Sequence, residues 1–315
     1  MKEASPLVQN PLLKYSIEKL LNVANPRGEY FFKKTHLNKM IYLLFLRLKE
    51  REIDIQLPYY WYRYGSLVDE RSFEIMVGNP LSHYYTHDGS TRAMNRVPQI
   101  EIDASIRAAI DEEIHALVRK YQNGNGLFFK GYLQQILDDA YATAPYEFQR
   151  TFNRGLLKYA EQFRTPVRKK IPVSLHLQDN EIASIREYLA ILNNDFNNDF
   201  SEIFDLFLEW EDTMQLSLKY DHKVALKLLN EYWEFFVNLL RINKHENIPQ
   251  SEVDEWIRKF HEHDLITFEK SLKKTRNDLL LQDLGNSSVS EEIDHSVDQI
   301  MDYAFQLSMN NRSSR

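Results

Sequence analysis

Apolar and polar residues follow one another along this chain mostly with the period of amphipathic helices. The clearest stripe in the N-terminal half lies in residues 35–51, where six apolar positions recur at helical spacing: Leu37, Met40, Ile41, Leu44, Phe45 and Leu48. Such a stripe predicts a helix with one face against a core. Thr35 can accept a hydrogen bond from a first-turn amide, and the basic residues up to Arg51 suit the negative end of the helix dipole.

An aromatic run, LPYYWYRYG, follows this predicted helix at residues 57–65. Pro58 disfavours helix, and rings of this size are costly to leave in water. In an extended strand the side chains fall on two faces, Tyr60, Tyr62 and Tyr64 on one and Tyr59, Trp61 and Arg63 on the other. We expect one face in the core. The other face either recognises a partner or is buried as well.

Turn and capping residues mark the end of the aromatic run. Gly65 permits a turn that a side chain would hinder. Ser66, with Asp69 three positions later, predicts a capping box that opens a helix at Ser66. That helix should end near Gly78, because Asn79 and Pro80 follow it.

Residues 81–103 have β character on both sides of the Asp88-Gly89 turn, which predicts a hairpin. Two helices closed by a hairpin give the element order of a winged helix. Arg92 and Arg96 would then lie on the wing, where such folds contact a phosphate backbone. A solvated loop accounts for the same residues equally well.

The helix, the aromatic run and the glycine turn together resemble the core of the SocA-like antitoxin (Panacea) domain. The resemblance continues in the segment DAYATAPYEFQ (Asp139 to Gln149), which is similar to that family's Thr-x-x-x-Pro-aromatic ending. It covers roughly residues 10–155, about half of the chain. It implies a non-catalytic, winged-helix-like module of prokaryotic toxin neutralisation or phage-defence loci that acts by contact with another protein.

Further helices are predicted by periodicity at residues 106–121 and 128–141, and then from residue 179 onward. The strongest is at 225–240, whose apolar surface is too wide for a helix that faces solvent. Others are expected at 204–218, from Pro249 onward and at 264–284. A last amphipathic helix at 293–309 follows a polar linker. It either docks on its own domain or enters a groove on another chain.

We therefore expect a mostly α protein with a winged-helix-like N-terminal domain that carries a small β-hairpin, followed by a C-terminal helical bundle. The expected segments are a SocA-type domain at 1–165, a basic linker between prolines at 166–178, an acidic helical domain at 179–284, and a polar linker with the terminal helix at 285–315. The chain of 315 residues is long enough for two domains.

Composition narrows the function classes. Cysteine is absent, which excludes disulfides, thiolate metal sites and cysteine nucleophiles. Neither a signal peptide nor an apolar run of about 18 residues is found, so we expect a cytoplasmic protein without a membrane segment. The formal charge of −7 divides unevenly, about +6 in residues 1–175 and about −13 in residues 176–315. The basic half suits phosphates or an acidic partner, and the acidic half suits basic protein surfaces.

Candidate catalytic chemistry is sparse in the sequence. Phosphate-binding glycine loops, the serine-hydrolase elbow and the zinc-protease motif are all missing. His83 and His87 with Asp88, and His261 with His263, have spacings that are better explained as polar surface. We therefore expect no cofactor, no metal and no catalytic residue. A metal-dependent nuclease made from scattered Asp, Glu and Lys is a third hypothesis.

Two hypotheses in which the protein acts by binding rank above the nuclease hypothesis. The first is an adaptor or antitoxin-like subunit that binds another protein encoded nearby, such as a toxin or an ATPase, and its candidate contact residues are Tyr60, Tyr62, Tyr64, Arg63, Ile300, Met301 and Phe305. The alternative is a DNA-binding accessory subunit of a defence complex that contacts duplex DNA through Arg92, Arg96, Arg168, Lys169 and Lys170. The last three also fit a solvated linker.

Overall fold

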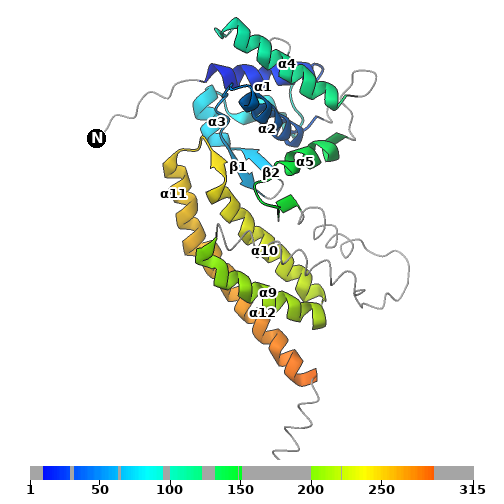
Figure 1. The fold of residues 1–315 in the computed structure, drawn as a ribbon, viewed down its shortest axis with the longest axis vertical. Helices are drawn as coiled ribbons and strands as arrows, with labels where there is room; N and C mark the ends of the chain where they lie inside the picture. The colour runs from blue at the N-terminus through cyan, green and yellow to red at the C-terminus, as the bar shows by residue number, and fades with distance from the viewer. Residues whose placement is uncertain are drawn as a thin grey trace, which may run out of the picture. The chain divides into compact units, whose positions relative to one another are not determined.

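The computed structural model describes residues 10–28, 32–62, 65–94, 100–122, 132–147, 149–150, 200–220 and 222–286. As predicted, the described chain is mostly helical, and it contains a small antiparallel sheet (Figure 1). The chain divides into two compact units, one of residues 1–171 with 233–264 and the other of residues 172–232 with 265–315. Helix α10 (His222–Asn243) contributes to both units. The predicted linker at 166–178 lies outside the described residues.

The described residues of the first unit before residue 150 form five α-helices: α1 (Pro11–Ala24), α2 (Lys34–Glu50), α3 (Glu70–Val77), α4 (Ala104–Lys120) and α5 (Leu133–Ala142). Helix α1 begins at Pro11, because the Asn10 side chain accepts a hydrogen bond from Leu13 N at 3.0 Å and so caps the first turn. Helices α1, α2 and α4 bury their apolar stripes against one another. Glu113 on α4 also binds Arg47 of α2 and Arg51, the residue that follows α2, each at 2.6 Å.

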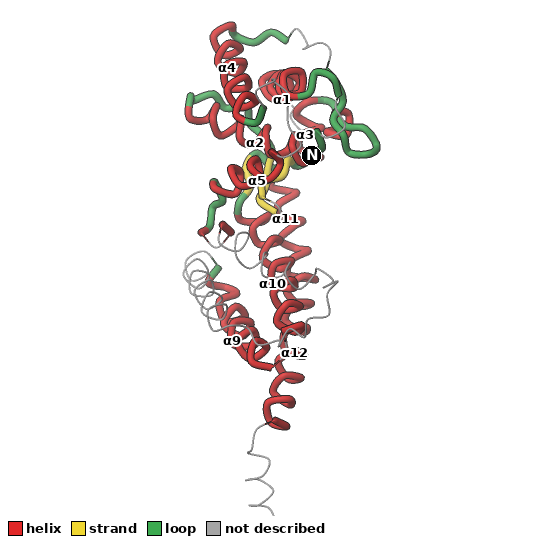
Figure 2. The backbone as a smooth tube through the Cα atoms, turned by 90° about the vertical axis from the view of Figure 1, so that its right-hand side faces the viewer, coloured by secondary structure: helices red, strands yellow, loops and turns green. Residues whose placement is uncertain are grey.

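The sheet of the first unit has the strand order β2-β1-β3 and is drawn in yellow in Figure 2. Strands β1 (Tyr59–Tyr62) and β2 (Gly65–Val68) form an antiparallel hairpin, in which Gly65 has a φ of +89°. A residue with a side chain is strained at this angle, so glycine is required at the turn. The short β3 (His245–Glu246) pairs with the other side of β1, although almost 200 residues separate them.

Two local predictions in this region were wrong. The helix expected to open at Ser66 begins at Glu70, because Ser66 lies in β2 and Asp69 is the N-cap that accepts a hydrogen bond from Ser72 N at 2.7 Å. Thr35 is exposed and does not cap α2, whose N-cap is Lys33. The expected end of α3 at Gly78 is confirmed, since this residue adopts the left-handed conformation.

The chain reverses at Asp88-Gly89 as predicted, with Thr86 N donating to Ser90 O and Arg92 N to Tyr84 O, but residues 81–94 form single bridges and no strand of a hairpin. This stretch begins as a 3-10 turn, η1 (Leu81–Tyr84), and continues into a tight turn held by the isolated bridges Tyr85–Thr91 and Lys33–Ser90. The strands of the hairpin lie instead in the aromatic run, which was expected to be extended, and in residues 65–68, where a helix was expected. The winged-helix arrangement stays a prediction.

In the second unit, η3 (Ser201–Ile203) leads into α9 (Phe204–Tyr220), which packs on α12 (Leu265–Asn286). Trp210 of α9 stacks on Tyr232 of α10 with ring centroids 4.1 Å apart, and Trp210 Nε1 donates to Leu228 O at 3.2 Å. Phe268 of α12 contacts the same tyrosine ring. These buried rings explain the wide apolar surface of α10.

The return of the chain to the first unit includes α11 (Gln250–Lys259) and a π-helical turn, η4 (Phe260–Asp264). Helix α11 begins beside Pro249, as the sequence predicts. Within the described part of the chain, no helix combines the length and apolar character needed to cross a membrane.

Candidate functional site

One face of β1, in the aromatic run, packs in the core. Tyr59 and Trp61 are 9% and 3% exposed and lie over α2, where the ring of Tyr42 is 4.9 Å and 5.8 Å from theirs. Trp61 also meets Tyr141 of α5, edge to face at 6.3 Å. This face therefore attaches the hairpin to α2 and α5.

The opposite face of β1 is covered in part by the returning segment of the chain. The ring of Tyr60 meets Trp256 of α11 with centroids 5.3 Å apart. The guanidinium of Arg241 lies 4.6 Å from the Tyr60 centroid and 3.9 Å from the Trp256 centroid, which is cation–π geometry with both rings. Tyr62 contacts Tyr60 edge to face at 6.2 Å. Tyr60 and Tyr62 nevertheless keep partial exposure.

The outer edge of β2 carries peptide groups that β1 cannot satisfy. Asp69 N donates to Pro58 O at 2.9 Å, which marks these two residues as a hydrogen-bonded pair of the hairpin. Because such pairs alternate along an antiparallel ladder, the peptide groups of Ser66 and Val68 point away from β1. Edge groups of this kind are open to pairing with another strand unless something covers them.

Two side chains of α2 cover this edge. Lys39 Nζ donates to Ser66 O at 2.6 Å, and Val68 N donates to Asn38 Oδ1 at 3.1 Å. Both α2 residues are buried. The helix thus supplies the hydrogen bonds that a fourth strand would otherwise make, and strand addition is blocked at these two groups.

Lys39 is completely buried, and burial lowers the pKa of its ammonium group to about 7. Its Nζ lies 3.2 Å from the position a Cβ would take on Gly65. A low-pKa lysine near a serine suggests nucleophilic chemistry. Here, however, the amine binds the Ser66 carbonyl rather than the hydroxyl, and the Ser66 Oγ has no hydrogen-bond partner among the described residues. The arrangement is a structural cap on the sheet edge.

A hollow of about 350 Å³ opens beside Tyr60, between the start of α2, strand β2 and the start of α3. Eight residues line it: Lys34, Asn38, Tyr60, Leu67, Val68, Asp69, Glu70 and Arg71. Lys34 and Glu70 form an ion pair on its wall. An apolar wall with a charged rim is typical of a site that receives a side chain of a binding partner.

Carboxylates influence the titration of groups around this hollow, which we call the Tyr60 hollow. Burial raises the pKa of the Tyr60 hydroxyl; Arg241 opposes this rise, and Asp69 adds to it. Burial also raises the pKa of Glu252, and repulsion from Asp69 adds to that rise. Arg71 and Arg241 oppose the rise at Glu252, so Asp69 acts at the hollow beside cations of this chain.

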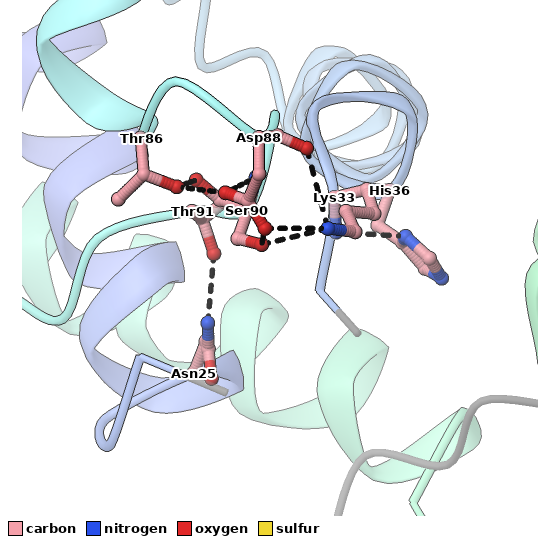
Figure 3. Close-up of polar contacts among 7 residues, drawn as sticks. All are labelled: Asn25, Lys33, His36, Thr86, Asp88, Ser90 and Thr91. Atoms are coloured by element: carbon pink, nitrogen blue, oxygen red, sulfur yellow. Dashed lines mark hydrogen bonds and ion pairs between the residues drawn. The ribbon is translucent and has the colours of Figure 1, made fainter. Parts of the chain in front are cut away.

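The turn at residues 86–91, predicted as a nucleic-acid-binding wing, is organised around a carboxylate (Figure 3). Asp88 accepts hydrogen bonds from the hydroxyl groups of Ser90 and Thr86 and from Lys33 Nζ at 3.0 Å. These bonds hold the pKa of Asp88 well below its usual range. Arg92 is exposed, and its Nε donates to Tyr85 O at 2.9 Å.

The remaining predicted contact residues lie outside the described part of the chain: Arg63, Tyr64, Arg96, Arg168, Lys169, Lys170, Ile300, Met301 and Phe305. The structure therefore places Tyr60, Tyr62 and Arg92 alone of the predicted set. Tyr60 and Tyr62 lie together on β1, and Arg92 lies on the turn after η1. Among the described residues, no group of three or more His, Asp or Glu is arranged to hold a metal ion.

Sequence reasoning missed most of the Tyr60 hollow. Asp69 was interpreted as the N3 residue of a capping box that starts at Ser66, so its place in the lining of a hollow was not considered. Trp256 and Arg241 had no sequence signal that could connect them with Tyr60, since the connection depends on the return of the chain. A polar pair, Asn38-Lys39, within an otherwise buried helix was a signal that could have indicated the covered sheet edge.

The chain matches none of the protein-family models, curated proteins or solved structures with which it was compared. The resemblance to SocA-like antitoxins therefore stays a prediction that rests on the motifs alone.

Proposed function

We propose that this protein is a non-enzymatic interaction module, of the adaptor or antitoxin kind, that binds another protein through the Tyr60 hollow. The observation that carries the proposal is the hollow itself. It joins the aromatic run to the first turns of two helices and presents Tyr60 and Leu67 beside charged groups. Binding energy at protein interfaces concentrates in such places, where an aromatic anchor lies next to a fixed charge.

The contacts of the ionisable groups in the first unit favour this proposal over a catalytic function. Lys39 caps a sheet edge, Asp88 organises a turn, and Glu113 joins α4 to α2 through Arg47 and Arg51. Each of these groups is engaged in holding the fold, whereas an acid or base in catalysis must face a substrate. The groups around the Tyr60 hollow suit recognition better than bond making.

Purification of the affinity-tagged full-length chain from its own host, after cross-linking, tests the proposal. We expect one other protein in a near-equal molar amount. Replacing Leu67 with lysine should remove that protein, because a new charge would stand on the apolar wall of the hollow. Leu281→Lys is the matched control, since Leu281 is already 69% exposed and lies on α12. Equal recovery by wild type and Leu67→Lys would contradict the proposal.

Duplex DNA is the second candidate partner, and the observation in its favour is the exposed Arg92, held in place by its bond to Tyr85 O. If DNA is bound there, retention on a duplex should fall steeply with salt and should weaken in Arg92→Glu. Retention that is independent of salt would remove this candidate.

A further inference from the structure

Asp69 has a carboxylate oxygen that the fold does not use. The side chain is only 5% exposed, and its Oδ1 accepts the capping hydrogen bond from Ser72 N. Its Oδ2 has no hydrogen-bond partner among the described residues, and Asp69 lines the Tyr60 hollow. A mostly buried carboxylate with a free oxygen is favourable only if a donor reaches it, so a donor is expected from the hollow.

The cations that line the hollow make no described hydrogen bond or ion pair with the Asp69 carboxylate. Lys34 is paired with Glu70, and its ammonium lies 5.3 Å from the ring centroid of Tyr85. Arg71 also lines the hollow, and it lowers the pKa of Glu252. Asp69 Oδ2 therefore has no donor from this chain among the described residues. A carboxylate oxygen binds a charged donor more strongly than a neutral one, which favours a cation from outside.

The aromatic side of the site already carries a guanidinium of this chain. Arg241 lies over both Tyr60 and Trp256, at 4.6 Å and 3.9 Å from the ring centroids. Tyr60 is therefore a ring whose electrostatics suit a cation. The same tyrosine lines the hollow together with Asp69, so the hollow combines an aromatic group with a carboxylate, as sites for arginine and lysine side chains do.

We propose that the Tyr60 hollow receives a basic side chain, arginine or lysine, from the partner protein, with Asp69 as its counter-charge. This inference rests on the proposed interaction function and adds the chemistry of the partner. It also agrees with the volume of the hollow, about 350 Å³, which lies near the lower end of the range for small ligand sites.

Selection of peptides tests the inference without a known partner. A phage library of random short peptides is selected on the immobilised full-length chain, and selected peptides are measured by calorimetry. We expect them to share an arginine or lysine and to bind about tenfold or more weakly when that residue is replaced by glutamine. Asp69→Asn should weaken them by a similar factor. Asparagine keeps the N-cap hydrogen bond, so the start of α3 is preserved.

Asp103→Asn is the matched control, because Asp103 also caps a helix, α4, and is exposed away from the hollow. It should leave peptide binding unchanged. Peptides that are weakened by Leu67→Lys but lack a basic residue, or are indifferent to Asp69→Asn, would overturn this inference and leave the proposed function standing. Selection of acidic peptides would overturn it as well. If no selected peptide and no host protein responds to Leu67→Lys, the proposed function fails too.

Discussion

Replacing Lys39 with methionine should change how the stability of the protein depends on pH. The Lys39 side chain is fully buried, and its pKa falls from 10.5 to about 7 on folding. Between these two values the unfolded chain binds a proton that the folded protein does not. The free energy of unfolding should therefore rise with pH across this window. Below about pH 7 both states are protonated, and the cost of burying the charge is complete.

The magnitude follows from the difference in pKa. A difference of roughly 3.5 pH units corresponds to about 5 kcal/mol between the ends of the window, at about 1.4 kcal/mol for each pH unit. Methionine has a similar length without a titrating group, so Lys39→Met should lose this slope. The variant also leaves the Ser66 carbonyl without its donor, which costs about 1–3 kcal/mol at every pH. The informative quantity is therefore the pH dependence of the difference in unfolding free energy between wild type and Lys39→Met.

Denaturant unfolding at several values from pH 6.5 to 9.5 measures this slope. The range stops there because buried tyrosines such as Tyr84, whose pKa is raised, lower the stability above about pH 10. Lys259→Met, which changes an exposed lysine on α11, is the matched control and should run parallel to wild type. If the curves of Lys39→Met and wild type are also parallel, Lys39 does not lose its proton on folding and the reasoning fails.

Three further substitutions test the packing of the first unit in thermal or denaturant unfolding. Gly65→Ala should destabilise by about 2 kcal/mol, since alanine is strained at a φ of +89° and its Cβ would stand 3.2 Å from Lys39 Nζ; an unchanged midpoint would contradict this. Glu113→Gln should lower the free energy of unfolding by about 1–3 kcal/mol, because a nearly buried carboxylate loses charge-assisted bonds to two arginines. If the stability of the wild type is the same at low and high salt, this electrostatic explanation is wrong. Trp256→Ala should lower the free energy of unfolding by about 3 kcal/mol and increase the exposure of Arg241. If it destabilises the protein less than a substitution on the surface does, Trp256 has no packing role.

Helices could be predicted from the sequence because their signal is local. The stripe that begins at Leu37 and the capping positions before α4 and α11 specify helices with little help from distant residues. The hairpin of the sheet was missed for a related reason. Asp88-Gly89 is a strong turn signal, but its flanking residues form a 3-10 turn and single bridges. The hairpin of the sheet pairs Tyr62 with Gly65, and the sequence signal for it was the turn that Gly65 permits.

The candidate site could not be predicted to the same extent, because it depends on contacts between distant residues. The strand β3 and the ring of Trp256 reach β1 from almost 200 residues away, and residues 233–264 were expected to belong with the C-terminal helices. Periodicity identifies the buried face of α10 but not what lies on it. The alternation of the aromatic run did predict that Tyr59 and Trp61 would share one face and Tyr60 and Tyr62 the other.

The covered edge of β2 explains why recognition in this region should depend on side chains. A bare edge strand binds any extended segment through its backbone, which gives affinity with little selectivity. Here Lys39 and Asn38 occupy the Ser66 carbonyl and the Val68 amide at that edge, and β3 pairs with the other side of β1. A partner that approaches the aromatic run therefore meets the Tyr60 hollow rather than free peptide groups. If a partner binds there as we propose, its affinity comes from a few side-chain contacts, and the charge of Asp69 contributes to the selectivity between partners.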